Sequence, residues 1–359
     1  MSARPAGVSL PYHPAVSGNP YQGLLYGRCA AAGIEPHPIR DVLELGDSAT
    51  ARPTVALHLH WTHTFLRNSG DRSEAEDRIA RLKRALDRLL SDGGRIIWTV
   101  HNVLPHETSF PDLEASVCGA IAARASVVHV MCDATIEAAA PWYEIPRERT
   151  VVIPHASYLG VYPNYLSPQE ARARLGLEAQ HTVLTVFGGI RRYKALPALL
   201  DAFEAISARL PDLRLVIAGK PMGYAGIAAL RSRREGNRAV VAHLDRVPAR
   251  DVQLYLNAAD ALVLPHESVL NSGVVGLAHA FGRPVIAPRT GCVAQQVTAE
   301  TGITFEPADR ASLEQALADA GSLKAPRYRA AALKRAHAYP PDSMAADFAA
   351  LVRRICAGR

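Results

Sequence analysis

The chain has 359 residues, of which 48% are apolar and 21% are charged, as expected of a folded protein long enough for two α/β domains. Its net charge of +6 and isoelectric point of about 9.1 suit an anionic ligand or an anionic membrane surface. The cations are too evenly spread for a nucleic-acid tract, no apolar run is long enough to span a membrane, and the 5 cysteines lack metal-ligand spacing. Because the N-terminal sequence has no signal-peptide core, we expect a cytoplasmic protein.

The first half of the chain alternates short β-rich runs with helical patterns. The expected helices are Tyr21–Ala32, Glu74–Leu90 and Leu113–Ala123. The expected strands are Val8–Leu10, Thr54–His60, Arg95–Val100, Ser126–Met131 and Thr150–Ile153.

The second half repeats this alternation. Its expected strands are Thr182–Phe187, Leu213–Ala218, Ala239–His243, Ala261–Leu264 and Pro284–Ala287. Its expected helices are Pro168–Leu175, Leu196–Leu210, Ala249–Asn257, Gly273–Phe281 and Pro341–Cys356.

The segment His155–Ser167 has no clear period and separates the two halves. Ser167 and Pro168 then form a helix-start pattern, with serine as N-cap and proline as the first helical residue. Alternating strands and helices predict parallel sheets covered on both faces. We therefore expect an α/β protein of two Rossmann-like domains facing a central cleft, residues 1–160 and 161–340, with residues 341–359 crossing back to the first domain.

The helix Glu74–Leu90 carries a basic face beside an apolar stripe. The simpler interpretation is a solvated face with i,i+4 ion pairs such as Glu74 with Arg78. The alternative is a peripheral contact with anionic lipid at the inner face of the cell membrane.

Two clusters of the first half follow expected strands. The first is the loop Val16–Tyr21, which contains Asn19 and stands where a first βα loop faces a cleft, unless it is an ordinary glycine turn. In the second cluster, alternation places His58 and His60 on one face of a strand that ends at Trp61. No third ligand is evident for a metal ion, so we expect these residues to line a polar cleft, with Trp61 as a stacking surface for a sugar ring.

A third cluster follows the strand Arg95–Val100. It contains His101, Asn102, His106 and Glu107. Transfer to a hydroxyl group needs a base or polar groups that stabilise the leaving charge, and histidine and glutamate commonly serve there. The alternative is that His106 and Glu107 are solvated loop residues.

The most informative segment is Phe187–Lys194. A buried strand ends in Gly188 and Gly189, and Arg191 and Lys194 precede a helix. Glycines permit close backbone approach, a helix start offers free N–H groups, and the cations neutralise charge, so this segment predicts a diphosphate site. It matches neither the P-loop nor the Gly-x-Gly-x-x-Gly pattern, and the alternative is a basic surface turn.

Two other turns of the second half have the same character. Gly219 and Lys220 follow another expected strand. Asn271, Ser272 and Gly273 stand at a helix start, where Ser272 is expected to cap the helix and free N–H groups to receive phosphate oxygens. Three basic or N–H-rich turns at strand ends of one domain are hard to explain as chance.

Together these motifs resemble the GT-B glycosyltransferases, in particular family-4-like bacterial enzymes. Arg191 and Lys194 match the pair that holds the donor diphosphate in such enzymes, and Gly273–Pro288 and Thr290–Val297 match their donor-site helix and the loop after it. The chain departs from the family at the usual Glu-x7-Glu, where Val269 and Leu277 stand. Ribose binding by the second glutamate is therefore not carried over.

The motifs of both halves resemble most those of the xanthan-type GDP-mannose β-mannosyltransferases. The resemblance implies a hexosyltransferase without a metal or other cofactor, a GDP-sugar donor with a UDP-sugar as the alternative, and a saccharide or polyprenyl-diphosphate-linked acceptor. It implies donor binding by the three glycine turns and a base or acceptor-orienting role for Glu107, His106 or His101. The implied acceptor-binding residues are Asn19, Tyr21, His60, Trp61 and Asn102.

Two alternatives remain on the same fold. A nucleotide-sugar 2-epimerase would convert the donor without any acceptor. A non-catalytic nucleotide-sugar-binding protein would bind nucleotide without hydrolysis or transfer.

Overall fold

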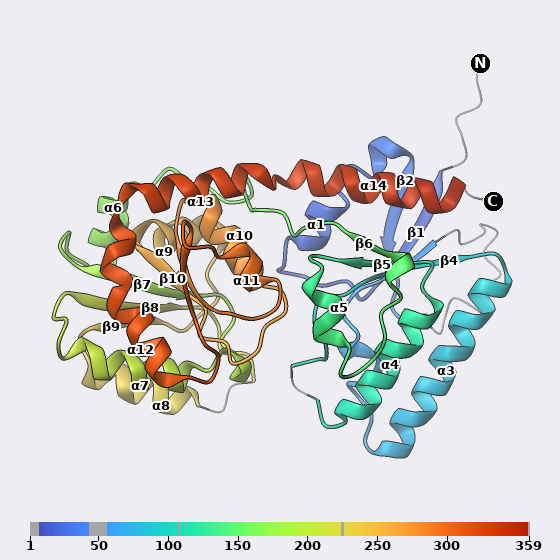
Figure 1. The fold of residues 1–359 in the computed structure, drawn as a ribbon, viewed down its shortest axis with the longest axis horizontal. Helices are drawn as coiled ribbons and strands as arrows, with labels where there is room; N and C mark the ends of the chain where they lie inside the picture. Colours follow the sequence, from blue (N-terminus) through green and yellow to red (C-terminus); the bar gives the residue numbers. More distant parts are fainter. Residues whose placement is uncertain (1–6, 43–55, 107, 224–225, 358–359) are drawn as a thin grey trace. The chain divides into compact units, whose positions relative to one another are not determined.

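The chain forms two compact units in the computed structural model, which describes residues 7–42, 56–106, 108–223 and 226–357. Unit 1 comprises residues 1–156 and 341–359, and unit 2 comprises residues 157–340. Each unit holds a six-stranded sheet between helices (Figure 1). The α/β class predicted from the alternating patterns is confirmed.

All strand pairs in unit 1 are parallel, in the order β2-β1-β3-β4-β5-β6. The chain places β2 on one side of β1 and β3 on the other, so sheet growth reverses between β1 and β3. The edge strand β2 was not predicted, because Pro36 and Pro38 weaken its strand pattern, and prolines are tolerated at an edge. The strands are β1 (Val8–His13), β2 (Ile34–Pro38), β3 (Ala56–Leu59), β4 (Arg95–Thr99), β5 (Val127–Val130) and β6 (Thr150–Val152).

Helices α3 and α4 pack together on one face of this sheet, and α1 packs with α14 on the other (Figure 1). The predicted helix Tyr21–Ala32 is too long, because α1 ends at Leu25 and the glycine-containing turn after it separates α1 from a 3-10 turn at Ala30–Ala32. The helices are α1 (Tyr21–Leu25), α2 (His63–Leu66), α3 (Arg72–Ser91), α4 (Pro111–Arg124), α5 (Ala134–Ala139) and α14 (Pro341–Ala357).

The basic helix α3 forms several ion pairs. Arg78 lies 3.2 Å from Glu74, which confirms the predicted i,i+4 pair. Asp87 accepts hydrogen bonds from Nε and Nη2 of Arg124 in α4, at 2.7 and 2.9 Å. Asp71 caps the helix by accepting from the Glu74 backbone N–H. Charge on this face is thus partly paired.

All strand pairs in unit 2 are also parallel, in the order β12-β11-β10-β7-β8-β9. Here the sheet grows from β7 to β9 in one direction and from β10 to β12 in the other, so growth reverses between β7 and β10. The strands are β7 (Thr182–Phe187), β8 (Leu213–Ala218), β9 (Val240–His243), β10 (Ala261–Val263), β11 (Val285–Pro288) and β12 (Gly302–Phe305).

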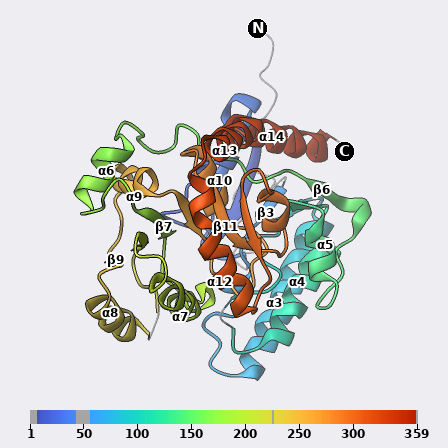
Figure 2. The same cartoon turned by 60° about the vertical axis from the view of Figure 1, so that its left-hand side comes forward.

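In unit 2, α7 packs against α12, whereas α6 packs against α9 and α10 packs against α13 (Figures 1 and 2). The predicted start of α6 is confirmed, since Ser167 and Glu170 form a reciprocal capping box. Strand β12 and helices α8, α11, α12 and α13 were not predicted. The helices are α6 (Pro168–Arg174), α7 (Leu196–Ser207), α8 (Ile227–Gly236), α9 (Val252–Ala258), α10 (Gly273–Ala280), α11 (Val293–Gln296), α12 (Arg310–Ala318) and α13 (Pro326–Ala338).

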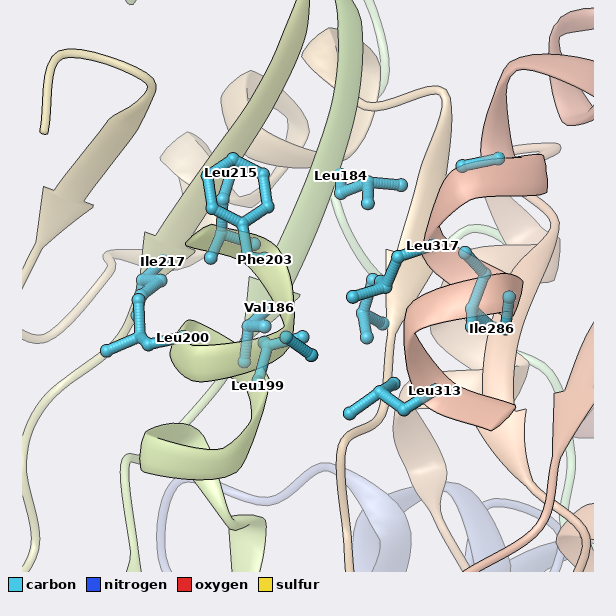
Figure 3. Packing of buried hydrophobic residues seen from close by; sticks show 14 of the residues in the cluster. Leu184, Val186, Leu199, Leu200, Phe203, Leu215, Ile217, Ile286, Leu313 and Leu317 are labelled. Carbon is cyan, nitrogen blue, oxygen red and sulfur yellow. The ribbon is translucent and has the colours of Figure 1, made fainter. Parts of the chain in front are cut away.

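The main apolar core of unit 2 lies between its sheet and helices α7 and α12. Phe203 of α7 is fully buried together with Leu215 of β8, and Leu317 of α12 lies in the same cluster (Figure 3). Burial of each such side chain contributes about 1.5–3 kcal/mol. This core fixes the strand ends at which the candidate site is built.

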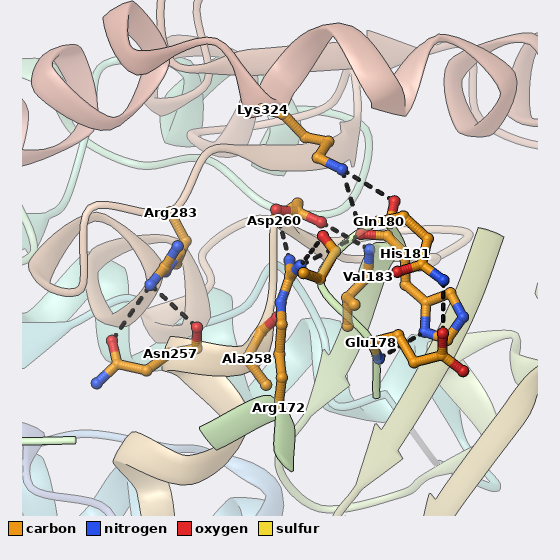
Figure 4. Close-up of polar contacts among 11 residues, drawn as sticks. Arg172, Glu178, Gln180, His181, Val183, Asn257, Ala258, Asp260, Arg283 and Lys324 are labelled. Atoms are coloured by element: carbon orange, nitrogen blue, oxygen red, sulfur yellow. Dashed lines mark hydrogen bonds and ion pairs between the residues drawn. The ribbon is translucent and has the colours of Figure 1, made fainter. Parts of the chain in front are cut away.

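A buried ion pair joins α6 to the start of β10. Nη2 of Arg172 lies 2.8 Å from Oδ1 of Asp260, and both side chains are about nine-tenths buried (Figure 4). The other carboxylate oxygen accepts from the Val183 backbone N–H at 2.8 Å. Asp260 therefore links a helix to the first residues of β7 and is satisfied on both oxygens.

Replacing Asp260 by alanine is expected to lower the free energy of unfolding by about 3–5 kcal/mol, because Arg172 would remain buried without its partner. Chemical denaturation of the purified variant measures this change. The control is Arg310→Ala, which breaks the more exposed pair with Glu314 and should cost less than about 0.5 kcal/mol. Equal effects of the two substitutions would contradict the structural role of Asp260.

Candidate functional site

The candidate donor site of unit 2 lies where sheet growth reverses. In parallel sheets, loops on either side of such a reversal diverge and leave a crevice at the carboxyl ends of the strands. In unit 2 these are the turn after β7, residues 188–195, and the loop after β10, residues 264–272. Both contain residues predicted to bind the donor.

The turns after β7 and β8 are held side by side by backbone hydrogen bonds. Ile190 N–H donates to the Lys220 carbonyl, and Met222 N–H donates to the Ile190 carbonyl, each at 2.8 Å. Gly188 has a φ of +94°, and a Cβ on Gly219 would lie 2.0 Å from the Gly188 carbonyl oxygen. Glycine is therefore required at both positions, and the predicted residues Gly188, Gly189, Gly219 and Lys220 come together.

Lys194 occupies the centre of this arrangement. Its side chain is buried, with 7% of the residue exposed, and Nζ donates to the Phe187 carbonyl at 3.2 Å. Burial, and then the positive charge of Arg191, lower the pKa of Lys194 from 10.5 to about 8. No carboxylate of the described residues offsets this shift. The turn thus holds a poorly compensated cation, which is a suitable environment for an anionic ligand.

The next residue, Ala195, has a φ of +46° and is the N-cap of helix α7. This left-handed conformation is costly for a residue with a Cβ. Its energy is offset by the surrounding core, in which Ala195 and Leu196 are buried. The turn is therefore held in a strained form, and the hydrogen bond of Lys194 to the Phe187 carbonyl directs this side chain back towards the end of β7.

The loop after β10 contacts the turn after β7 through aromatic rings. The centroids of Tyr193 and His266 lie 5.3 Å apart. The end of this loop is fixed by Thr290, whose hydroxyl donates to the Val269 carbonyl at 3.0 Å, and by Cys292, whose N–H donates to the Leu270 carbonyl at 2.9 Å.

Asn271, Ser272 and Gly273 lie at the start of α10, as predicted from the helical pattern. The prediction that the Ser272 side chain caps this helix is wrong. Ser272 occupies the N-cap position, but its hydroxyl makes no capping hydrogen bond. Leu277, at the position where the family carries its second glutamate, is buried on α10. Its apolar side chain supports packing of the helix.

The candidate acceptor side lies at the corresponding edge of unit 1. Tyr21 follows the loop after β1, His60 and Trp61 follow β3, and His101 follows β4. Trp61 stacks on His101 with ring centroids 3.9 Å apart, and Tyr21 meets the His101 ring edge-on at 4.9 Å. Four predicted residues from three loops thus form one aromatic cluster.

A row of hydrogen-bonded side chains continues from this cluster into the sheet. The Tyr26 hydroxyl lies 2.8 Å from Nδ1 of His58 and 2.7 Å from Nε2 of His60. Nδ1 of His60 lies 3.0 Å from Nε2 of His101. The predicted placement of His58 and His60 on one face of the strand is confirmed, although His60 is almost fully buried.

These histidines are held neutral by burial. Desolvation lowers the pKa of His58, His60 and His101 well below the usual value, and neighbouring imidazoles lower it further. The pKa of His129, on the adjacent strand β5, is lowered to about 4 mainly by burial. At neutral pH the cluster therefore acts through uncharged imidazoles.

The other predicted residues of this edge lie on its loops. Asn19 is exposed, and its side chain accepts from the Tyr21 backbone N–H at 3.0 Å. Asn102 is half-buried, whereas His106 is exposed. Glu107 lies outside the described residues.

Three comparisons bear on the family. Residues 181–321 match the family model described as glycosyl transferases group 1. The GDP-mannose:glycolipid 4-beta-D-mannosyltransferase of Xanthomonas campestris pv. campestris is 26% identical over 278 residues, which are 77% of this chain and 71% of that protein. This chain contains a glycosyl transferase group 1 domain.

Solved structures are similar to the fold of this chain over nearly its whole length. The sucrose-phosphate synthase of Thermosynechococcus elongatus superposes with a TM-score of 0.75 at 17% identity, covering 99% of this chain and all of that one. Anabaena HepE in complex with UDP superposes with a TM-score of 0.70 at 15% identity, covering 97% and 100%. The predicted GT-B fold is confirmed.

The group 1 domain contains every residue predicted to bind the donor, since residues 188–273 lie inside the matched segment. Sequence reasoning missed Tyr193 and His266, which join the two loops, and Tyr26, Thr99 and His129 in unit 1. His129 gave one usable signal, a histidine inside an apolar strand, because buried polar side chains in strands need partners.

Substituting Lys194 by methionine is expected to stabilise the ligand-free protein at pH 7 by about 1–2 kcal/mol. The pKa of Lys194 is lowered from 10.5 to about 8, which at ~1.4 kcal/mol per pKa unit means that the charged form destabilises the folded protein by about 3 kcal/mol. Methionine removes this cost but also removes the stabilising hydrogen bond to the Phe187 carbonyl, so the net gain is smaller. Because the unfolded chain binds this proton more tightly, the difference should shrink as pH rises from 8 to 10.5. Denaturation at pH 7 and pH 10 checks this, and a less stable variant at pH 7 would show that Lys194 is compensated.

Proposed function

We propose that this protein transfers a hexose, with mannose favoured, from a nucleoside-diphosphate sugar to a saccharide or lipid-linked saccharide. The observation that carries the proposal is the buried, poorly compensated Lys194 at the carboxyl edge of the unit 2 sheet. A diphosphate is the ligand class that such a cation, neighbouring glycine turns and a helix start fit best.

Residues 161–340 are proposed to bind the donor and residues 1–160 the acceptor. Arg191 and Lys194 would offset the charge that develops on the β-phosphate oxygen as the bond from that oxygen to the anomeric carbon breaks. The backbone N–H groups at Ser272 and Gly273 would share this role. These groups would make a metal ion unnecessary, and full activity in the presence of EDTA is the corresponding check.

On the acceptor side, the hydroxyl oxygen would attack the anomeric carbon while its proton passes to a base. The electron pair of the broken bond then leaves with the nucleoside diphosphate. His101, His106 and Glu107 are the proposed base or acceptor-orienting groups, and Asn19, Tyr21, His60, Trp61 and Asn102 are proposed to build the acceptor side. Of these, Tyr21 and Trp61 pack directly against His101.

The donor is proposed to be GDP-mannose, with a UDP-sugar as the alternative. The Xanthomonas relative is named for GDP-mannose and a glycolipid, whereas the Anabaena structure contains UDP. A glycolipid acceptor would bring this protein to the inner face of the cell membrane, and the basic helix α3 is the proposed contact. No helix within the described residues is long and apolar enough to cross a membrane.

Nucleotide binding and turnover should both depend on Arg191 and Lys194. GDP is expected to raise the melting temperature of the wild-type protein more than UDP or dTDP, because ligand bound only to the folded state stabilises it. Arg191→Ala and Lys194→Met should abolish this shift and lower GDP release from GDP-mannose at least 100-fold. A polyprenyl-diphosphate-linked oligosaccharide should accelerate that release.

The matched control is Arg192→Ala, which removes an exposed cation from the same turn and should leave both measurements nearly unchanged. Near-normal turnover in Arg191→Ala and Lys194→Met would refute the assigned donor site. Conversion of GDP-mannose to another sugar nucleotide without acceptor would identify an epimerase instead.

GDP affinity should fall with rising pH. In the protein without ligand the pKa of Lys194 is about 8, and a bound diphosphate favours the charged form of this side chain. Above pH 8, binding therefore requires Lys194 to take up a proton. The dissociation constant should stay nearly constant between pH 7 and 7.5 and then increase towards tenfold per pH unit by pH 9. Calorimetric titrations measure this, and Lys194→Arg, whose guanidinium stays charged, should bind with a flatter profile.

A further inference from the structure

The hydrogen-bonded row in unit 1 extends across three neighbouring strands. Nε2 of His58 on β3 lies 2.8 Å from the Thr99 hydroxyl on β4, and that hydroxyl lies 2.9 Å from Nδ1 of His129 on β5. Nε2 of His129 lies 3.0 Å from the backbone carbonyl of Ile153. With the contacts of Tyr26, the row runs without a gap from Ile153 to His101.

The direction of every hydrogen bond in this row follows from its end. A carbonyl oxygen only accepts, so His129 donates from Nε2 to Ile153, and in the neutral imidazole Nδ1 must then accept. The Thr99 hydroxyl has one proton, which it gives to His129, and so it accepts from Nε2 of His58.

The same reasoning carries on towards the loops. Nδ1 of His58 now accepts from the Tyr26 hydroxyl, which has one proton and therefore accepts from Nε2 of His60. Nδ1 of His60 is left as an acceptor and takes the proton of Nε2 of His101. The direction of each hydrogen bond thus fixes the direction of the next one, and with it the tautomer of each imidazole.

We propose that the row of His129, Thr99, His58, Tyr26 and His60 is a positioning network that holds His101 in its Nε2-protonated tautomer, with the lone pair on Nδ1. In this tautomer Nδ1 accepts a hydrogen bond and does not donate one. His101 would therefore receive the acceptor hydroxyl or its proton and would not serve as a hydrogen-bond donor from Nδ1 to the leaving diphosphate. This assignment of a role to His101 rests on the proposed function, whereas the tautomer does not.

The network is built to stay neutral and rigid. His58, Thr99 and His129 are fully buried, and Phe348 of α14 stacks on the His58 ring at 4.8 Å. Burial lowers the pKa of each imidazole, so all of them remain uncharged at neutral pH. Because the row ends at a carbonyl, which cannot take up a proton, it orients His101 and does not conduct its proton away.

The proposal is tested directly by the nitrogen resonances of His101. In protein labelled with ¹⁵N-histidine at pH 7, two-bond ¹H–¹⁵N spectra should show His101 protonated on Nε2 and unprotonated on Nδ1, with assignment by loss of the signals in His101→Asn. Thr99→Val should convert His101 into a mixture of tautomers, whereas Thr99→Ser should preserve the wild-type spectrum. Wild-type protein with the proton on Nδ1 of His101 would overturn the proposal.

Kinetics provide a second readout. Thr99→Val should lower the rate of GDP release from GDP-mannose about 10–100-fold at saturating donor while the dissociation constant for GDP stays unchanged, and Thr99→Ser should restore the rate. The control is Thr150→Val, which removes a hydroxyl bonded to the Pro146 carbonyl at 2.8 Å outside the row and should change neither spectrum nor rate.

Coupling between distant members distinguishes a network from separate contacts. Tyr26→Phe breaks the row nearer to His101, so adding Thr99→Val to it should cost little further activity. Fully additive losses would contradict a single positioning row. If GDP-mannose is not turned over, the proposed function fails, and the spectra of wild type and Thr99→Val still decide the tautomer.

Discussion

In both units, a parallel sheet grows first in one direction from its initial strand and then in the other. The strands on either side of this reversal, β1 with β3 and β7 with β10, send their following loops apart at the carboxyl edge. In unit 2 the closely packed glycine turns and the buried Lys194 lie at this point, and in unit 1 an aromatic cluster lies there. The packing beneath them, such as Phe203 against the β8 face, keeps the strand ends fixed.

Two of the buried charged groups in the described part of unit 2 serve opposite purposes. Asp260 is paired with Arg172 and accepts a backbone N–H, so its charge serves the fold. Lys194 has a carbonyl as its hydrogen-bond partner and a second cation as an electrostatic neighbour. Such an arrangement costs stability in the empty protein and favours an anion when one arrives. The charge of Lys194 thus lowers the stability of the folded protein and raises its affinity for an anion.

Sequence patterns predicted the strongly periodic parts of this protein well. Strands β7 and β8 and helices α3 and α14 lie within a few residues of their expected bounds, and the turn at Gly188 stands where two glycines end an apolar run. The edge strand β2 was hidden by its prolines, and α8 by its polar composition. The histidine row could not be predicted, because it joins Tyr26, His58, Thr99 and His129 through strand order and register, which follow from tertiary packing. The absence of a side-chain cap at Ser272 likewise depends on loop geometry that residue types do not fix.

The position of α14 has a consequence for biosynthesis. Its residues Phe348 and Val352 complete the core of unit 1 beside Leu10 and Leu25, although they are translated after the whole of unit 2. During synthesis, unit 2 can bury its own core while the apolar surface of α1 and the His58 ring still lack their cover. The nascent unit 1 is therefore the part of this protein that needs protection from aggregation on the ribosome, in contrast to the usual order in which the N-terminal domain folds first.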